Sequence, residues 1–463
     1  MASLAGLLKE AGHRVTGSDE NVYPPMSDEL EAMGIEYAVG YKPENLDSRP
    51  DIVVVGNAIS RGNPELEAVL ERKLYYTSAA VTIKDEFIRG RHSMAVAGTH
   101  GKTSTTSLLA WTLECAGKKP SFLIGGVAEN FGKSFRLSDS DIFVIEADEY
   151  DTAYFDKGPK MWHYLPDTAI VNNIEFDHAD IYRDEEAYRF AFARFINLIP
   201  RNGTLVAGWD SPIVRELAPR SFAPVEYFSF EGDEPLGEKG WSAKDVTFGE
   251  KGTRFTVTRD SAVVGTFEMP MTGAFSVRNA LAVMAAASSA GAAPEAIAEA
   301  FRTYKSVKRR MEVKGEAGGV LVIDDFAHHP TAVRETMAAV RQKYSGRRLI
   351  AIFEPRSYTA QRREFQNDYA KALSTADEIV FGGLFHPERY TKETAVDPLA
   401  LVDSWRSAGT PAEHIADADR IVEYLSPRLR SGDVVLVMSN GGFGGIHGKL
   451  LKALGGPAPE LTP

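Results

Sequence analysis

Residues 92–104 read HSMAVAGTHGKTS, and this stretch predicts the fold of the middle of the chain. It begins as an apolar strand, and residues 98–104 (GTHGKTS) form a turn, here called the glycine turn, that leads into a helix. Backbone N–H groups and the positive end of the helix dipole then converge on one point, which suits a phosphate group. In such a turn Lys102 reaches the β- and γ-phosphates of a nucleotide, and the Thr103 hydroxyl contacts Mg²⁺.

The whole glycine turn is therefore predicted to bind nucleotide phosphates: Gly98, Thr99, His100, Gly101, Lys102, Thr103 and Ser104. The general phosphate-binding loop has a further glycine at the position that Val96 occupies here. An ordinary strand-to-helix turn is therefore the alternative interpretation.

Acidic side chains follow two further apolar runs of the strand type. Residues 141–151 read DIFVIEADEYD, which places Glu146 at a strand end, and a later run leads into NNIEFDHAD. The carboxyl ends of parallel strands share one edge of a sheet, where nucleotides and metals bind in α/β folds. Glu146 is therefore a candidate Mg²⁺ ligand. His178, between Asp177 and Asp180, is a candidate for a second cation or a substrate phosphate. A solvated acidic loop and a structural histidine are the alternatives.

Strand and helix patterns alternate over most of the chain, which is typical of α/β folds with parallel sheets. Strands are predicted at residues 51–56, 92–97, 141–145, 168–171, 320–323, 349–353, 378–381 and 434–438. An Ala-rich helix is predicted at about 277–290, and the strand pattern restarts after residues 308–310. We predict three α/β domains: a Rossmann-like domain at 1–90, a P-loop ATPase-like domain at 91–311 and a second Rossmann-like domain at 312–463.

The N-terminal domain starts on an unexpected element. Residues 1–11 predict a helix, residues 13–16 a short strand, and DIVVVG at 51–56 a strand buried on both faces of a sheet. Doubly wound domains usually begin with a strand and a Gly-rich phosphate loop, and here the first strand and that loop are missing. We therefore expect Met1 to be an internal methionine of a longer protein.

Composition excludes several functional classes. The chain has 463 residues, of which 44 % are hydrophobic and 25 % charged, as in globular proteins with sizeable cores. Its net charge of −12 argues against a general nucleic-acid binder, whose surface would be basic. No apolar run approaches the roughly 20 residues of a membrane span. The single cysteine, Cys115, forms no internal disulfide, so a reducing cytoplasm is expected.

Three further motifs follow strands of the last domain. In DDFAHHP, Asp325 is placed to accept hydrogen bonds from a ribose, and His328 to pack against a base; a helix cap is the alternative for the paired histidines. In EPRS, the guanidinium of Arg356 suits a carboxylate, with a surface salt bridge as the alternative. In SNGGFGG at 439–445 the glycines permit a ligand to approach the backbone, or give only a flexible loop.

Together these motifs resemble the Mur ligases, the ATP-dependent amide-forming enzymes of bacterial cell-wall precursor synthesis. The resemblance runs nearly end to end. Its specific pieces include TGSDENVYPPMS at 16–27, GNAISRGNPELEAVL at 56–70, EADEYDTAYFDK at 146–157 and VMSNGGFGGIHGKLL at 437–451. It implies an N-terminal domain for a UDP-sugar, a central ATPase domain and a C-terminal domain for the incoming amine.

The resemblance also implies roles for individual residues. It assigns catalysis to Lys102, Glu146, His178 and Arg310. It assigns Mg²⁺ to Thr103 and Glu146 and the second cation region to His178, and the rest of ATP to Asn279 (adenine), Arg310 (γ-phosphate), Asp325 (ribose) and His328. It assigns binding of the tripeptide to Arg356, Ser357, Asn440, Gly441 and Gly442. It assigns binding of the UDP-sugar to Ser18, Asp19 and Asn57.

The implied reaction joins the tripeptide L-Ala-γ-D-Glu-meso-diaminopimelate to UDP-N-acetylmuramate through an acyl phosphate, in peptidoglycan synthesis and recycling. ATP and Mg²⁺ are the implied cofactors, with no nucleic-acid or membrane partner, and a monomer or weak homo-oligomer is expected. EYDTAYFDK, EPRS and SNGGFGGIH favour the tripeptide over L-alanine as the amine, and the L-alanine-adding reaction is the alternative. A P-loop ATPase acting as a switch and a non-catalytic sugar-nucleotide sensor are rivals from other classes.

Overall fold

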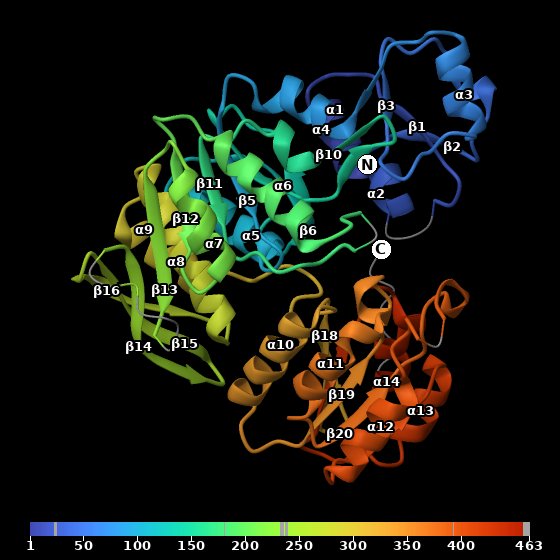
Figure 1. Ribbon diagram of the computed structural model, residues 1–463, viewed down its shortest axis with the longest axis vertical. Coiled ribbons are helices and arrows are strands. Elements are labelled where there is room, and N and C mark those ends of the chain that lie inside the picture. Colours follow the sequence, from blue (N-terminus) through green and yellow to red (C-terminus); the bar gives the residue numbers. More distant parts are fainter. Residues whose placement is uncertain (23–25, 180, 232–235, 237–238, 392, 457–463) are drawn as a thin grey trace.

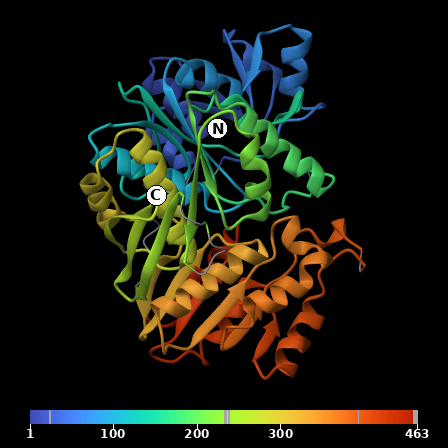
Figure 2. The same cartoon turned by 60° about the vertical axis from the view of Figure 1, so that its left-hand side comes forward.

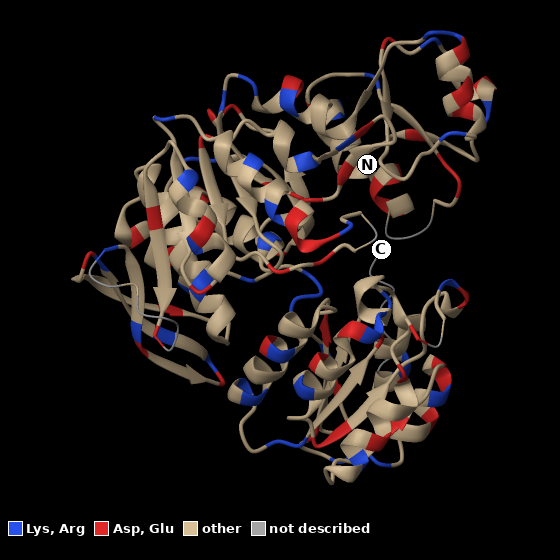
Figure 3. Cartoon of the chain, in the orientation of Figure 1, with Lys and Arg blue, Asp and Glu red and all other residues tan. Residues whose placement is uncertain are grey.

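The computed structural model describes residues 1–22, 26–179, 181–231, 236, 239–391 and 393–456. The chain forms an N-terminal part, a central part and a C-terminal part, in the order of the colours in Figure 1. Figure 2 shows the C-terminal part below the other two in a second view. Figure 3 shows acidic and basic residues interspersed over all three parts. No helix of the described residues is long and apolar enough to cross a membrane.

A ten-stranded sheet forms the central part, in the order β16-β15-β14-β13-β12-β11-β5-β8-β6-β7. Its strands are β5 (His92–Ala97), β6 (Ser121–Ala128), β7 (Lys133–Arg136), β8 (Ile142–Glu146), β11 (Thr168–Val171), β12 (Thr204–Gly208), β13 (Val225–Phe230), β14 (Trp241–Gly249), β15 (Gly252–Arg259) and β16 (Ala262–Met269). The core strands β6, β8, β5, β11, β12 and β13 run parallel, and the expected strands at 92–97, 141–145 and 168–171 are confirmed.

Helices cover both faces of this sheet because alternate residues of its strands point to opposite sides. Met94 and Val96 of β5 pack in one core with α5 (Lys102–Cys115), α8 (Ala274–Ser289) and α9 (Pro294–Thr303). Ala95 and Ala97 pack in the other core, with α6 (Glu185–Asn197) and α7 (Pro212–Leu217). The helix predicted at 277–290 is confirmed as α8. β9 (Asp151–Ala153) and β10 (Asp156–Pro159) form a small antiparallel hairpin beside the sheet.

A six-stranded sheet forms the C-terminal part, in the order β17-β18-β22-β19-β20-β21. Its strands are β17 (Glu312–Ala317), β18 (Val320–Asp325), β19 (Leu349–Phe353), β20 (Glu378–Phe381), β21 (Ala412–His414) and β22 (Val434–Met438). Only β17 pairs in the antiparallel sense. The register places Met438 opposite both Asp325 and Phe353, so three neighbouring strands end level with one another.

Five helices cover the two faces of this second sheet. Side chains of α10 (Pro330–Lys343), α11 (Gln366–Leu373) and α12 (Pro398–Ser407) pack on one face. Side chains of α13 (Ala418–Leu425) and α14 (Ile446–Ala453) pack on the other. The four strands predicted here from apolar runs are confirmed as β18, β19, β20 and β22.

The N-terminal part differs from the prediction in two ways. Its strands β1 (Thr16–Asp19), β2 (Glu36–Val39), β3 (Val53–Val55) and β4 (Tyr76–Ser78) form two separate parallel pairs, β1-β2 and β3-β4. The strand expected at 13–16 is wrong, because the strand begins at Thr16. The strand expected at 51–56 is short and only half-buried, because a two-stranded sheet leaves much of its surface uncovered.

The helices of the N-terminal part are α1 (Ala2–Glu10), α2 (Met26–Ala32), α3 (Pro64–Glu71) and α4 (Ala79–Ile83). The opening helix is confirmed as α1, and its Leu4 and Leu7 pack in the core of the central part. The side chain of Asn63 caps α3, accepting the N–H groups of Glu65 and Leu66 at 3.0 Å each. Residues 23–25, within the motif at 16–27, and Asp180 lie outside the described residues.

Candidate active site

The glycine turn joins β5 to α5, and two of its glycines have backbone angles that other residues rarely adopt. Gly98 has a φ of +137° and Gly101 a φ of +80°. A Cβ atom at Gly101 would lie 2.8 Å from Oδ1 of Asn279, so glycine also gives α8 room to approach. The turn therefore places backbone N–H groups at the start of a 14-residue helix, as the sequence predicts.

The segment after β11 holds the glycine turn in place. Oδ1 of Asn173 accepts the N–H of His100 at 2.8 Å, and the carbonyl oxygen of Asn173 accepts the N–H of Thr99 at 2.9 Å. The Thr99 hydroxyl donates to the carbonyl oxygen of Glu175 at 2.9 Å. On the other side, the carbonyl oxygen of Ser104 accepts the hydroxyl of Tyr304 at 3.2 Å. The turn is thus fixed from outside and leaves Lys102 and Thr103 to face the acids.

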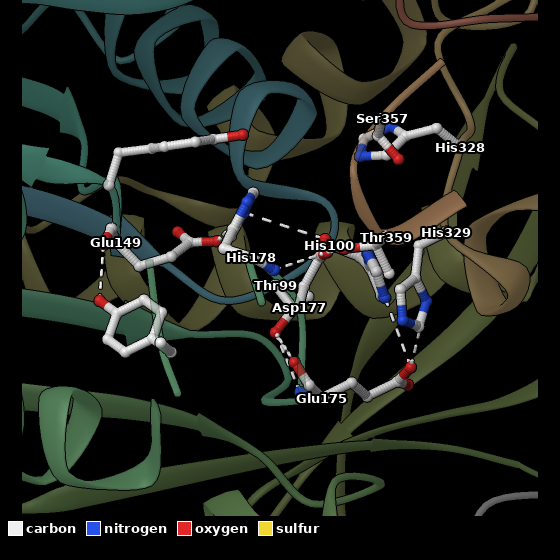
Figure 4. Close-up of polar contacts among 12 residues, drawn as sticks. Thr99, His100, Glu149, Glu175, Asp177, His178, His328, His329, Ser357 and Thr359 are labelled. Atoms are coloured by element: carbon white, nitrogen blue, oxygen red, sulfur yellow. Dashed lines mark hydrogen bonds and ion pairs between the residues drawn. The ribbon is translucent and has the colours of Figure 1, made fainter. Parts of the chain in front are cut away.

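Lys102 and His178 meet at the fully buried carboxylate of Glu149. Nζ of Lys102 lies 2.8 Å from Oε2 of Glu149 and donates to the Gly98 carbonyl oxygen at 2.7 Å. Nε2 of His178 lies 3.2 Å from Oε1 of Glu149, and Figure 4 labels these two residues. Burial opposes ionisation of Glu149, but the charges of Lys102 and His178 outweigh it and lower its pKa. Burial lowers the pKa of His178, whereas Glu149 and Asp177 raise it. Overall, the pKa of His178 is raised.

Glu146, at the end of β8, lies against the start of α5. Its Oε1 accepts the Thr103 hydroxyl at 2.9 Å, and its Oε2 accepts the N–H of Gly125 at 2.8 Å. A Cβ atom at Gly125 would lie 2.6 Å from Oε2, so this cradle requires glycine. Burial raises the pKa of Glu146. A hydroxyl and a carboxylate are oxygen ligands of the kind that Mg²⁺ prefers, and these residues fit such an ion.

A cavity of about 440 Å³, here called the central cavity, extends from the glycine turn to the C-terminal part. It is lined by His100, Gly101 and Ser104 of the turn, by Asn279, Arg310 and Asp325, and by the apolar side chains Phe228, Met269 and Met271. Its size and mixed lining suit a nucleoside. The structure thus brings together most of the residues predicted to bind the nucleotide.

Asp325 enters the central cavity from the end of β18. Its carboxylate accepts the N–H groups of Met311 at 2.7 Å and Ala327 at 2.8 Å, and burial raises its pKa. Arg310 stacks its guanidinium over the Phe326 ring at 4.8 Å from the centroid. Both residues therefore have defined positions on the C-terminal side of the cavity.

The described residues that line the central cavity do not include His328, so the structure does not bring His328 to this cavity. Its Nδ1 lies 3.1 Å from the Phe326 carbonyl oxygen, and its own carbonyl oxygen accepts the Tyr369 hydroxyl at 2.6 Å. Its neighbour His329 caps α10, as the alternative interpretation of this pair has it: Nδ1 of His329 accepts the N–H of Thr331 at 3.4 Å.

Two loops of the C-terminal part lie in contact: the loop that contains Arg356 and the glycine-rich loop at residues 439–445. A Cβ atom at Gly441 would lie 2.3 Å from Cδ of Arg356, so the arginine packs directly on this glycine. The Arg356 guanidinium stacks over the Phe385 ring, 4.2 Å from its centroid. Oδ1 of Asn440 is buried and accepts no hydrogen bond from the residues that the structure describes, which leaves an acceptor for a ligand. The hydroxyl of Ser357 accepts the N–H of Ala360 at 3.0 Å and closes a turn.

A Cβ atom at Gly442 would meet no atom of the described residues within 4 Å, so this part of the loop is open with respect to them. The remaining candidates lie in the N-terminal part. Ser18 donates to Glu65 at 2.7 Å, Asp19 accepts the N–H of Asn21 at 3.0 Å, and Asn57 is exposed. Among the described residues, no hydrogen bond connects these three side chains to the glycine turn.

Several residues of this site receive no individual role in the prediction from the sequence. Asn173, Glu149 and Glu175 follow strands, so the rule of strand ends would have found them, although it would not have assigned their partners. The apolar wall of Phe228, Met269 and Met271 comes from the far side of the sheet and carries no local motif.

Three family models match the chain in succession: "Mur ligase family, catalytic domain" at residues 1–85, "Mur ligase middle domain" at 96–287 and "Mur ligase, glutamate ligase domain" at 309–441. Together with a relative 42 % identical over 98 % of the chain, they show that the chain belongs to the Mur ligase family. Members of this family are ATP-dependent enzymes that form amide bonds.

That relative is the UDP-N-acetylmuramate–L-alanyl-γ-D-glutamyl-meso-2,6-diaminoheptandioate ligase of Escherichia coli (strain K12), of which 96 % is covered. A UDP-N-acetylmuramate–L-alanine ligase of Burkholderia thailandensis is 33 % identical over 98 % of the chain and 95 % of its own length. The crystal structure of a murein peptide ligase from Psychrobacter arcticus 273-4 is 35 % identical, with a TM-score of 0.72 over 98 % of this chain and 96 % of that one.

Proposed function

We propose that this chain is an ATP-dependent ligase that joins L-alanyl-γ-D-glutamyl-meso-diaminopimelate to UDP-N-acetylmuramate. One observation carries the proposal: the central cavity unites the glycine turn with Arg310 and Asp325 of the C-terminal side. A nucleotide bound there lies between the part that holds its phosphates and the part that would hold the amine. The higher identity to the tripeptide-adding relative, 42 % against 33 %, favours the tripeptide over L-alanine.

In this proposal the central cavity holds the nucleoside of ATP. Asn279 contacts adenine, Asp325 accepts hydrogen bonds from the ribose, and Arg310 approaches the γ-phosphate. The backbone N–H groups of the glycine turn and Nζ of Lys102 bind the phosphates. Lys102 then exchanges part of its contact with Glu149 for the phosphate oxygens, so a positive charge is already in position when ATP arrives.

Thr103 and Glu146 would hold a Mg²⁺ ion, and His178, which contacts Glu149, is assigned to a second cation. Such ions supply charge neutralisation for phosphoryl transfer when bound. The chain's own residues orient these groups: Gly125 fixes Glu146, and Glu149 fixes both His178 and Lys102.

The reaction proceeds by acyl activation. An oxygen of the muramate carboxylate attacks the γ-phosphorus of ATP, the bond to the β-phosphate oxygen breaks, and an acyl phosphate and ADP form. The α-amine of the tripeptide attacks the acyl carbon, loses a proton, and inorganic phosphate leaves. Lys102 stabilises the charge on the transferred phosphoryl group. Because water would hydrolyse the acyl phosphate, the reaction requires the domains to enclose it.

The peptide and the sugar nucleotide are assigned to the outer parts. Arg356 suits a carboxylate of the tripeptide, beside Ser357, the unpaired amide oxygen of Asn440 and the loop glycines 441 and 442. Ser18, Asp19 and Asn57 are assigned to the UDP-sugar. The corresponding domains are residues 1–90, 91–311 and 312–463. The chain is assigned to peptidoglycan synthesis and recycling in the cytoplasm.

The test measures phosphate release with ATP, Mg²⁺ and UDP-N-acetylmuramate, first with the tripeptide and then with L-alanine. The proposal expects release with the tripeptide and little with L-alanine. Lys102→Ala should lower the rate at least about 100-fold with its circular dichroism unchanged, whereas Lys449→Ala, which removes the exposed partner of Asp419, should not. Turnover that requires no sugar nucleotide would instead indicate an ATPase switch, and faster turnover with L-alanine would identify the alternative ligase.

A further inference from the structure

Three potential metal ligands meet between the central and C-terminal parts, away from Thr103 and Glu146. This interdomain cluster consists of His100 in the glycine turn, Glu175 after β11, and His329 immediately before α10. Their ligand atoms all lie within 4.8 Å of one another. Figure 4 shows the two imidazoles converging on the carboxylate of Glu175. The cluster thus joins residues that belong to two separate sheets and their loops.

The two distances from the Glu175 carboxylate to the histidine nitrogens match those of a tetrahedral metal site. Nε2 of His100 lies 3.4 Å and Nδ1 of His329 lies 3.6 Å from Oε2 of Glu175. Two ligand atoms at the usual ~2.0–2.1 Å from a tetrahedral Zn²⁺ lie roughly 3.4 Å apart. Only small side-chain movements would therefore admit an ion, with water in the fourth position. Two nitrogens and one carboxylate oxygen suit Zn²⁺ and its neighbours rather than Mg²⁺.

The surroundings of the cluster also suit a ligand set. Thr331 donates its hydroxyl to Oε2 of Glu175 at 2.6 Å, which orients the carboxylate as outer hydrogen bonds do in metal sites. His329 is 5 % exposed, and its Nε2 has no hydrogen bond within the described part of the chain. Its Nδ1, the nitrogen nearer Glu175, accepts the N–H of Thr331 at 3.4 Å, and a bound ion would replace this long contact. The ring centroids of His100 and His329 lie 4.7 Å apart.

We propose that the interdomain cluster binds one divalent transition-metal ion of the zinc class. The ion links the glycine turn and Glu175 to the start of α10, and so stabilises the domain arrangement in which both sides line the central cavity. This inference goes beyond the ligase activity, because the site uses none of the residues assigned to Mg²⁺. It depends only on three side chains and their distances.

The test is a calorimetric titration of the nucleotide-free full chain with Zn²⁺, and a second titration with Co²⁺ followed by visible absorption. We expect one bound ion and the intense absorption of tetrahedral Co²⁺. His329→Asn removes the imidazole but keeps a side chain that caps α10, and it should weaken binding at least about tenfold. Glu175→Gln should do the same. His163→Asn is the control, since Nε2 of His163 lies 2.9 Å from the carboxylate of Asp156 but belongs to no group of three metal ligands among the described residues.

One further variant separates this site from the proposed Mg²⁺ site. Glu146→Gln should leave Zn²⁺ affinity within about twofold of the unmodified chain, because Glu146 lies outside the cluster. Unchanged binding in both His329→Asn and Glu175→Gln would overturn the proposal. So would a zinc ion that Glu146→Gln abolishes and His329→Asn retains. Because neither ATP nor peptide is present, the result does not depend on whether the proposed ligase reaction is correct.

Discussion

The ammonium of Lys102 lies 2.8 Å from the carboxylate of Glu149, and both side chains are nearly or fully buried. Lys102 is 12 % exposed and Glu149 not at all, so each is the principal compensation for the other's charge. Burial lowers the pKa of Lys102, yet Glu149, by its charge and its hydrogen bond, together with the charges of Asp148 and Glu146, more than offsets this and raises the pKa. The lysine that is assigned to the ATP phosphates is therefore charged and held in place before any nucleotide binds.

Glu149→Gln should destabilise the nucleotide-free chain by about 3 kcal/mol, because it leaves the buried charge of Lys102 without its partner. Saturating ATP with Mg²⁺ should recover much of this loss, since phosphate oxygens then contact Lys102. Urea unfolding with and without the nucleotide measures both effects. Glu114→Gln, which removes the partner of Arg136 in a more exposed ion pair, should cost less, with no added recovery.

Glu146→Gln should raise the Mg²⁺ concentration for half-maximal phosphate release at least about tenfold, because an amide is a weaker Mg²⁺ ligand than a carboxylate. The amide keeps the hydrogen bond from Gly125 and should preserve the fold. A Mg²⁺ titration of phosphate release gives the value, with Glu114→Gln as the control. An unchanged Mg²⁺ dependence would remove Glu146 from the proposed metal site.

Gly441→Ala should raise KM for the tripeptide and leave KM for ATP unchanged. The added methyl would lie 2.3 Å from Cδ of Arg356 and displace the guanidinium from its position over Phe385. Steady-state kinetics with each substrate varied in turn tests this. Gly249→Ala is the control, because its Cβ would meet only the Gly252 carbonyl oxygen, at 3.9 Å. Equal effects on both KM values would argue against a peptide-binding role.

Asp324 makes the stability of the C-terminal part depend on pH. It is 4 % exposed, with its carboxylate 3.3 Å from Nε2 of His447 and 3.3 Å from Nε of Arg309. Burial would raise its pKa, but His447 and Arg309 lower it. A lowered pKa in the folded state stabilises the protein above the unfolded value of about 4, and this stabilisation is lost as the pH falls through the folded value.

Asp324→Asn should therefore destabilise the chain by about 1–3 kcal/mol at neutral pH, with a shrinking difference as the pH falls below about 4. Urea unfolding at several pH values measures this difference. Asp419→Asn, which removes the exposed partner of Lys449, should have a smaller effect at neutral pH. A constant difference between Asp324→Asn and the unmodified chain over this range would contradict the assignment.

Local patterns predict much of the fold. The strand, turn and helix of residues 92–115 are encoded by neighbours in sequence, as are β8, β11 and the strands of the second sheet. The N-terminal strands are predicted less well, because short strands at the edge of small sheets take their limits from tertiary pairing. The meeting of His100 with His329 has no local signal, since it depends on how two domains pack.

The sequence predicts the candidate site to about the same extent as it predicts the fold. Lys102, Glu146 and Asp325 are found from their positions at or after strand ends, and Asp325 lines the central cavity, while their roles stay predictions. His328 and His329 show the limit of this reasoning: sequence position does not say which of two adjacent rings turns toward the neighbouring domain. The structure turns His329 toward His100 and leaves His328 against its own loop.

The level ends of β18, β22 and β19 have an evolutionary consequence. Asp325 sits on the first strand, the asparagine-glycine loop follows the second, and Arg356 follows the third. Adjacent strands are ~4.8 Å apart, and the N–H of Ser439 donates to the carbonyl oxygen of Asp325 at 3.1 Å, so the residue assigned to the ribose and the loops assigned to the amine share one rim. Mutations that change the accepted amine are thus restricted to those that leave this rim beside Asp325 in place.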